Sequence, residues 1–176
     1  MKQRYLLLIV ILIPMFFGCT IKHEYEWYEM EISSEEMPPE VVVKEGKIIN
    51  IIKGKSNNEE KDFGSVGPHH YFATTQVLTD AVADQLAIEL RKKRVKIENG
   101  NEKYIEITVT NFQFEQNFMT ICTTLDINLI WGNDKNKSIK VNSCTPGTVP
   151  RLYDGVVQVA VLQILKEPEV LAYINS

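Results

Sequence analysis

The chain has 176 residues, with 19 Lys and Arg against 23 Asp and Glu, and a formal net charge of −4. An acidic chain without a broad cationic cluster argues against a nucleic-acid partner, because phosphate binding draws its affinity from Lys and Arg side chains that release counterions. A body of this size is most simply one domain behind an N-terminal lead-in.

The first 18 residues have the layout of a bacterial export signal. Lys2 and Arg4 form a short positive region, and Leu6 to Phe17 is an apolar run of twelve residues that contains Pro14. A membrane-spanning helix needs about 20 apolar residues, whereas the core of a signal peptide needs about 7 to 15. The run is therefore too short to span a membrane and has the length of a cleaved segment.

The end of this segment resembles the lipobox of bacterial lipoprotein signal peptides. Gly18 and Cys19 match the small residue and the cysteine of that pattern, while Phe16 and Phe17 are bulkier than the family's residues at those positions. The resemblance implies removal of residues 1–18 and acylation of Cys19, where several chains at about 0.8 kcal/mol per buried methylene make a stable anchor. The alternative is an uncleaved N-terminal anchor in which Cys19 is a juxtamembrane cysteine. In both cases the body is tethered to a membrane and works outside the cytoplasm.

Residues 19–40 are predicted to form an acidic tether, because the stretch from Thr20 to Gly46 carries eight glutamates against only two lysines. A short strand is expected around Tyr25 to Ile32. The aromatic side chains Tyr25, Trp27 and Tyr28 do not suit a passive linker, since such side chains usually bury area or mark an interface. Two interpretations stay open: they pack back onto the body, or they bind a partner.

Residues 41–176 are predicted to form one α+β domain. Val41 to Lys53 suggests a strand pair or one kinked strand, and Gly54 to His70 has the composition of a polar loop. Thr75 to Arg94 shows apolar residues at helical spacing, with Thr74 or Thr75 as N-cap. The basic run at its end complements the helix dipole. Val95 to Ile97 then indicates a short strand.

Three strands with a period of two follow, between Tyr104 and Cys144. The apolar phase changes from odd to even positions between Val109 and Phe112, which predicts a bulge. Gly132 to Lys137 is expected to be a hairpin loop. Leu152 to Lys166 is apolar on most sides and predicts a largely buried helix, which Pro168 ends before a final turn.

Cys122 and Cys144 are the only cysteines left if Cys19 is lipidated, and an oxidising periplasm permits a disulfide between them. The register expected for the two strands that carry these cysteines argues against that bond. Pairing of the apolar faces, with Trp131 opposite Ile139, places Cys144 opposite Asp126. Cys122 is then about 13 Å away along its strand, whereas a disulfide needs Cα atoms within about 7 Å. The bond requires a different loop, a bulge or a bend, so both the bonded and the free state stay open.

Groups suited to catalysis are sparse. His23 falls in the tether, and His69 and His70 are neighbours in the predicted loop, where adjacent side chains tend to diverge. No zinc-protease, serine-hydrolase or phosphate-loop motif is present in the sequence. We therefore expect no enzyme activity, no cofactor and no metal, with a metal site at His69 and His70 as the alternative to a solvated loop.

The order of predicted elements is similar to that of small envelope lipoproteins of the YajG-like and ABC-transport-auxiliary kind. The residues that carry the likeness are Val77 to Ile97, Tyr104 to Phe114, and Leu162 to Ile174 with its Glu-Pro step. The resemblance implies a mixed, mostly antiparallel sheet with two helices packed on one face, and a non-catalytic role.

The leading hypothesis is a membrane-anchored periplasmic lipoprotein that acts as an accessory or interaction protein of the cell envelope. Its expected partners are the membrane, through the lipid anchor, and another envelope protein, with no nucleic acid. The alternative is a binding module that holds a lipid or other small amphiphile between sheet and helices. Outer-membrane placement is favoured over inner, because Thr20 follows Cys19 in place of the Asp that resembles an inner-membrane retention signal.

Overall fold

A computed structural model of the chain describes residues 20–27, 29, 32, 37, 39, 41–116, 120–132, 134–146 and 149–176. The export segment 1–18, Cys19 and Tyr28 lie outside the described residues. Within the described residues no helix has the length and apolar character needed to cross a membrane.

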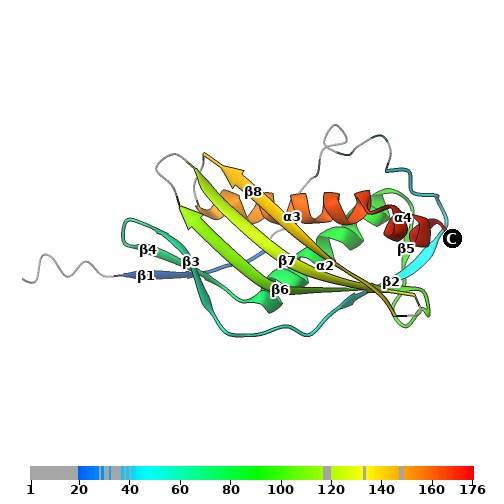
Figure 1. The fold of residues 1–176 in the computed structure, drawn as a ribbon, viewed down its shortest axis with the longest axis horizontal. Helices are drawn as coiled ribbons and strands as arrows, with labels where there is room; N and C mark the ends of the chain where they lie inside the picture. Colours follow the sequence, from blue (N-terminus) through cyan, green and yellow to red (C-terminus); the bar gives the residue numbers. More distant parts are fainter. Residues whose placement is uncertain are drawn as a thin grey trace, which may run out of the picture.

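The described chain forms two sheets and three helices. The larger sheet has five strands in the order β5-β2-β6-β7-β8, and the smaller has the order β1-β4-β3. Strands β2, β5 and β6 run parallel, while β6, β7 and β8 are antiparallel neighbours (Figure 1). The elements in chain order are β1 (Ile21–Glu24), β2 (Ile48–Lys53), β3 (Lys61–Val66), β4 (His69–Ala73), α2 (Thr75–Lys92), β5 (Lys96–Ile97), β6 (Tyr104–Gln116), β7 (Ile121–Trp131), β8 (Lys135–Thr145), α3 (Val149–Lys166) and α4 (Pro168–Asn175).

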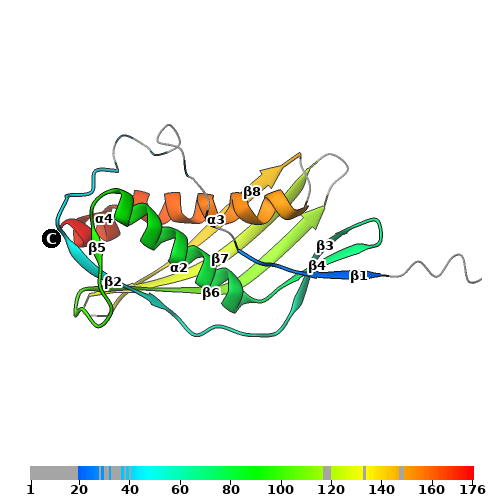
Figure 2. The ribbon, with the colours of Figure 1, turned by 180° about the vertical axis from the view of Figure 1, so that it is seen from behind.

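Helices α2 and α3 lie side by side on one face of the larger sheet (Figure 2). Helix α2 packs on β2 and β6, and α3 packs on β7 and β8. Along β7 buried and half-buried residues alternate strictly, which is the pattern of a strand with one covered face. The expected α+β class, with a mostly antiparallel sheet and two helices on one face, is confirmed.

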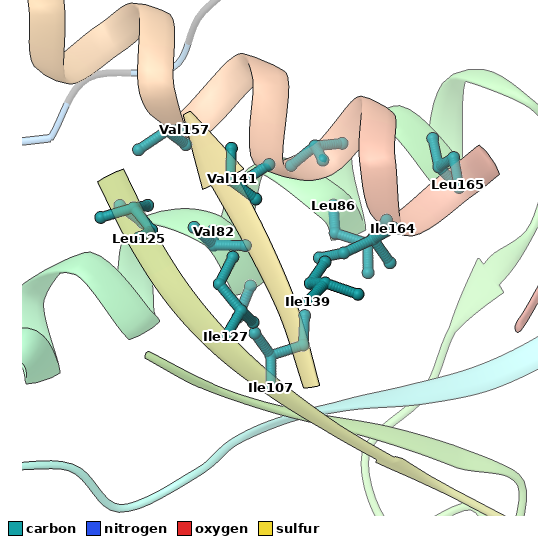
Figure 3. Packing of buried hydrophobic residues seen from close by; sticks show 14 of the residues in the cluster. Val82, Leu86, Ile107, Leu125, Ile127, Ile139, Val141, Val157, Ile164 and Leu165 are labelled. Atoms are coloured by element: carbon teal, nitrogen blue, oxygen red, sulfur yellow. The ribbon is translucent and has the colours of Figure 1, made fainter. Parts of the chain in front are cut away.

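The core lies between this sheet and the two helices. Side chains at or near zero exposure come from both layers, among them Leu86, Ile107, Leu125, Val157 and Ile164 (Figure 3). Burying each such side chain contributes about 1.5–3 kcal/mol relative to leaving it in water. The apolar periodicity that predicted the strands and helices therefore also selects the residues that fill the core.

The local signals at helix ends are borne out. Thr74 is the N-cap of α2, and its side chain accepts a hydrogen bond from the backbone N–H of Val77. Arg91 and Lys92 lie in the last turn, where cations complement the helix dipole. Pro168 begins α4 directly after α3 ends at Lys166, as expected of a residue that cannot continue a helix.

The prediction of a polar loop over Gly54 to His70 is wrong for its second half. Residues 61–66 and 69–73 form the hairpin β3–β4, which pairs antiparallel around the turn at Gly67 and Pro68. These strands lack an apolar alternation, because the small sheet buries few side chains: Phe63 and Ala73 are the core residues that it supplies. Stacking of Phe63 on Phe112 of β6 joins the small sheet to the large one.

The described residues of the lead-in include a strand and several side chains that contact the body. The described strand is Ile21–Glu24, which pairs parallel with β4. Of the strand expected around Tyr25 to Ile32, residues 25–27, 29 and 32 are not in a strand, and residues 28, 30 and 31 lie outside the described residues. Ile32 and Met37 are buried in the core, and Tyr25 and Trp27 pack against it. Packing onto the body, one of the two interpretations of these aromatic residues, is therefore confirmed for Tyr25 and Trp27.

Candidate functional site

The helices α2 and α3 leave one face of the larger sheet uncovered, and we call this regular strand surface the open face. Strand β2 places Ile48 and Ile52 on this face. The side chains that β6, β7 and β8 place there are hydroxyl, amide and charged groups apart from one isoleucine and two cysteines. None of them is buried. In cross-strand rows they are Glu106, Ile130 and Asn136; Thr108, Asn128 and Ser138; Asn111, Asp126 and Lys140; Gln113, Thr124 and Asn142; and Glu115, Cys122 and Cys144.

The bulge predicted from the phase change lies in the middle of this face. The register of β6 against β7 shifts between Val109 and Asn111, so that Thr110 is the extra residue. The amide of Asn111 donates to the carboxylate of Asp126 over 3.1 Å, and the hydroxyl of Thr110 donates to the Asp126 backbone carbonyl over 3.1 Å. Asp126 is thereby held in place at the centre of the open face.

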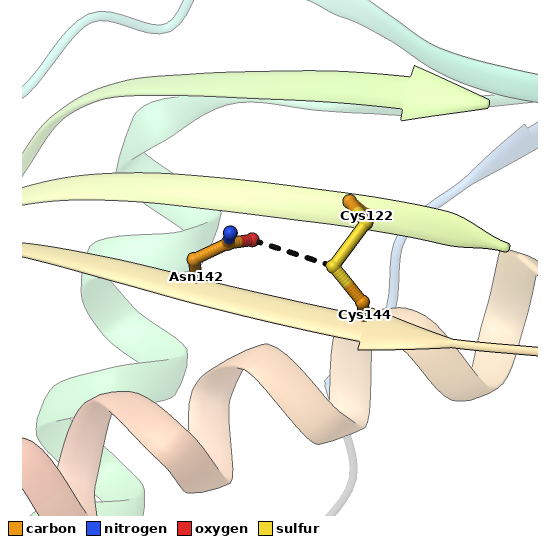
Figure 4. The surroundings of a disulfide bond; sticks show 3 residues. All are labelled: Cys122, Asn142 and Cys144. Carbon is orange, nitrogen blue, oxygen red and sulfur yellow. Dashed lines mark hydrogen bonds between the residues drawn. A yellow bond between two sulfur atoms is a disulfide. The ribbon is translucent and has the colours of Figure 1, made fainter. Parts of the chain in front are cut away.

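The disulfide Cys122–Cys144 closes the last row of the open face, with Cα atoms 4.1 Å apart (Figure 4). Cys144 Sγ lies 3.7 Å from Asn142 Oδ1. Because a disulfide sulfur carries no hydrogen, this approach is a contact and not a hydrogen bond. The bond ties β7 to β8 at the end of the hairpin opposite its turn.

The register expected for this hairpin is wrong by four residues. Ile127, and not Trp131, lies opposite Ile139, and Trp131 lies opposite Lys135. The cause is the turn, which takes only residues 132–134 in place of the expected Gly132 to Lys137. Gly132 and Asp134 have positive φ angles of 32° and 61°, as a tight hairpin turn requires. A shift by an even number keeps the apolar face buried and moves Cys144 from Asp126 to Cys122.

A cleft of about 810 Å³ opens at the end of the molecule that carries this turn. The start of β6, the β7–β8 turn and helix α4 line it, with Tyr104, Trp131 and Tyr173 as its aromatic residues. The hydroxyl oxygen of Tyr173 accepts the backbone N–H of Tyr104 over 3.1 Å. This hydrogen bond fastens α4 across the end of the sheet.

Lys103 is the cationic group most tightly held in the cleft. Its Nζ donates to the carbonyl of Ile174 over 3.1 Å and lies 5.4 Å from the ring centroid of Tyr173. Partial burial, and then the nearby charge of Lys47, lower the pKa of Lys103 below its usual 10.5. The cation stands at the C-terminal end of α4, where the helix dipole is negative.

The three histidines gather on the small sheet. His23 Nε2 and His69 Nδ1 are 2.8 Å apart, and the ring of His23 stacks on Tyr71. His70 points elsewhere, with Nδ1 3.3 Å from a carboxylate oxygen of Asp62. The expected divergence of His69 and His70 is confirmed, whereas the contact of His23 with His69 was not predicted. Among the described residues no group of three or more His, Cys, Asp or Glu side chains is placed to hold a metal ion.

The sequence patterns missed the cleft and the contact between His23 and His69. Tyr104 and Tyr173 occur in segments predicted only as a strand and a final turn, Lys103 directly precedes that strand, and no motif joins the three residues. The signal that the sequence offered was the presence of Tyr104, Trp131 and Tyr173 in three separate segments. Their presence does not show that these side chains line one cleft.

No protein-family model matches the chain, and no curated protein matches it. Solved structures do. A crystal structure of a Xanthomonas campestris protein of the family DUF330 is 12% identical, with a TM-score of 0.51 over 88% of this chain and 95% of that one. At this identity the match shows a shared fold. A Neisseria meningitidis lipoprotein is 14% identical, with a TM-score of 0.37 over 67% of this chain and 97% of its own.

Proposed function

We propose that this chain is a lipoprotein of the bacterial cell envelope, anchored through Cys19, facing the periplasm, and acting as a non-catalytic accessory protein that binds another envelope protein through its open face. The outer membrane is the proposed site, from the residue that follows Cys19. The observation that carries the proposal is the N-terminal pattern: a short apolar run that ends in Gly18 and Cys19 ahead of a folded body.

The chemistry of the open face supports the proposed mode of binding. Its rows present hydrogen-bond donors and acceptors, most of them on short Ser, Thr, Asn and Asp side chains, with Asp126 opposite Lys140 at the centre. Short side chains lose little conformational entropy when a partner covers them. A regular strand surface of this kind fits a flat polar protein surface better than a small ligand, which prefers a concave apolar pocket.

The alternative, an amphiphile held between sheet and helices, has no support in the packing. Leu86, Ile107 and Val157 have no accessible surface in that layer. A side chain without accessible surface borders no void large enough for a water molecule, and an acyl chain needs more room than that. Outside that layer, the cleft beside Tyr173 offers a volume of about 810 Å³ to a small ligand.

The anchor is tested by the intact mass of the mature protein from envelopes. We expect a chain that begins at Cys19 and carries the added mass of a diacylglycerol and an acyl group. The variant Cys19→Ser should accumulate as the unprocessed precursor. A mature chain that begins elsewhere, or one without acyl mass, contradicts the proposed anchoring.

The open face is tested by photo-crosslinking in intact envelopes, with p-benzoylphenylalanine placed at Asn128 on the open face or at Asn99 in an exposed turn. We expect one defined protein adduct from Asn128 and none from Asn99. The substitution Thr124→Arg, two rows away, should reduce the Asn128 adduct. Equal adducts at both positions, or none at Asn128, count against the proposed surface.

A further inference from the structure

We propose that the body does not hang from a flexible tether but lies directly on the bilayer, with the β3–β4 turn at Gly67 and Pro68 facing the lipid surface. The cleft beside Tyr173 then faces away from the membrane. The proposal rests on the acylation of Cys19 in the proposed function, and the bilayer is the one that holds this anchor.

The first step is the length of chain between anchor and fold. Cys19 and Ile21 are two residues apart. An extended chain covers about 3.3–3.6 Å per residue, so their Cα atoms are at most about 7 Å apart. An acylated Cys19 lies at the level of the lipid headgroups, and Ile21 must therefore lie within about one headgroup layer of it.

The second step is that Ile21 already belongs to the fold. Its backbone N–H donates to the carbonyl of Pro68 over 2.8 Å, and the N–H of Tyr25 donates to the carbonyl of Phe72 over 2.9 Å. Between these ends β1 pairs in register with β4. The strand nearest to the anchor is thus hydrogen-bonded along its whole length.

Side chains add to this attachment. The ammonium group of Lys22 contacts the carboxylate of Glu60 at 2.7 and 2.9 Å. His23 is hydrogen-bonded to His69 and stacks on Tyr71, with ring centroids 5.0 Å apart. An ion pair at the surface adds little by itself, but the contacts join β1 to both β4 and the segment before β3.

The third step is the direction in which β1 and β4 run relative to the anchor. Because β1 and β4 are parallel, both strands run from the turn into the body, and the turn lies level with Ile21. Gly67 and Pro68 are exposed there, and Ile21 is 43% exposed. An exposed isoleucine at this level can bury apolar area among the headgroups and acyl chains.

The opposite end of the molecule carries α4, the C-terminus and the cleft (Figure 1). Helix α3 lies between the two ends and has 18 residues, a length of about 27 Å. A body fixed at its β1 end therefore holds the cleft well clear of the lipid headgroups. The open face stands beside the membrane, where a second envelope protein can reach it.

The test uses the full-length lipoprotein in vesicles of phosphatidylethanolamine and phosphatidylglycerol. A p-benzoylphenylalanine residue replaces Pro68 in the turn or Asn99, which is exposed between β5 and β6. We expect the Pro68 position to give several times more lipid adduct than Asn99, as measured by mass. Equal adducts in a chain whose acyl mass is present overturn the orientation and leave the lipoprotein assignment standing. A chain without acyl mass overturns both.

A second variant tests the role of the short connection. A Gly/Ser linker of about 20 residues, inserted between Cys19 and Thr20, gives a mean reach of about 25 Å. We expect it to keep the acyl mass and to lower the Pro68 lipid adduct to the level of Asn99. An undiminished adduct would overturn the conclusion that the pairing of β1 holds the body on the membrane.

Discussion

Thr79 of helix α2 accepts the backbone N–H of Val109 on β6 over 2.9 Å. The same hydroxyl donates to the carbonyl of Thr75 and lies 2.9 Å from the hydroxyl of Ser56. Strand β2 pairs with β6 only as far as Ile107. A helix side chain therefore replaces the missing strand as hydrogen-bond partner, directly before the bulge in β6.

The substitution Thr79→Val tests this contact, because valine has the shape of threonine without the hydroxyl. We expect it to lower the free energy of unfolding by about 1–3 kcal/mol, since the N–H of the fully buried Val109 is left without a partner. Chemical denaturation measures the loss. Thr79→Ser keeps the hydroxyl and should cost about 0.8 kcal/mol, the value of one methyl group. A valine variant no less stable than the serine variant would contradict the proposed role.

The disulfide is tested by removing it. The two cysteines are separated by 22 residues, and closing a loop of that length stabilises a protein by about 3 kcal/mol. We expect the double variant Cys122→Ser, Cys144→Ser to unfold at correspondingly lower denaturant concentration. Reducing agent should destabilise the natural chain and leave the double variant unchanged. Two free thiols in the mass of the non-reduced mature protein would show that the bond does not form.

The hydrogen bond between His23 and His69 is expected to help hold β1 on β4. We expect His23→Ala to speed hydrogen exchange at the amides of Ile21 and Tyr25 by about fivefold, because a hydrogen bond worth about 1 kcal/mol is lost from a local opening. Exchange followed by mass spectrometry of the N-terminal peptide measures it. The control is His70→Ala, which removes a histidine that contacts Asp62 and should leave β1 unaffected. Equal effects of both variants would mean that the His23 contact does not hold β1.

Lys103 and Lys137 are expected to give stability profiles of opposite sign at alkaline pH. The pKa of Lys103 is lowered in the fold by burial, so the unfolded chain binds more protons just below pH 10.5 and the free energy of unfolding rises with pH there. The pKa of Lys137 is raised, first by its hydrogen bond to Glu167, so its contribution is present below 10.5 and is lost as the pH rises above that value.

Urea unfolding at a series of alkaline pH values measures both slopes. The variant Lys103→Met should flatten the rise below pH 10.5, and Lys137→Met should flatten the decline above it. The two variants serve as controls for each other, since each keeps the group that the other lacks. A Lys103→Met profile parallel to that of the natural chain would show that the burial of this lysine is not linked to folding.

Much of the larger sheet and both long helices could be predicted, because their signals are local. The periodicity of Thr75 to Arg94 depends only on residues within a few turns, and the alternation along β7 only on which face is covered. The bulge could also be predicted, since one extra residue in a strand shifts the apolar phase from odd to even positions, as happens between Val109 and Phe112.

The small sheet could not be predicted in the same way. Strands β3 and β4 bury little, so they carry no alternation, and their glycines favoured a loop. Strand β4 lies between β3 and a second neighbour, β1, which comes from more than 40 residues earlier in the chain. The contact of His23 with His69 spans a separation of 46 residues. Such pairing depends on the closure of long loops and leaves no periodic trace.

The sequence by itself determined the export pattern before Cys19, the α2 helix and the alternating strands, because composition and periodicity act over short distances. The tertiary structure alone decided that Cys144 lies opposite Cys122, that Thr79 reaches Val109, and that β1 begins two residues after the proposed anchor. Each of these follows from how the chain closes on itself. The turns and the shared core decide which strand lies beside which and in what register. The sequence of a single segment does not contain this information.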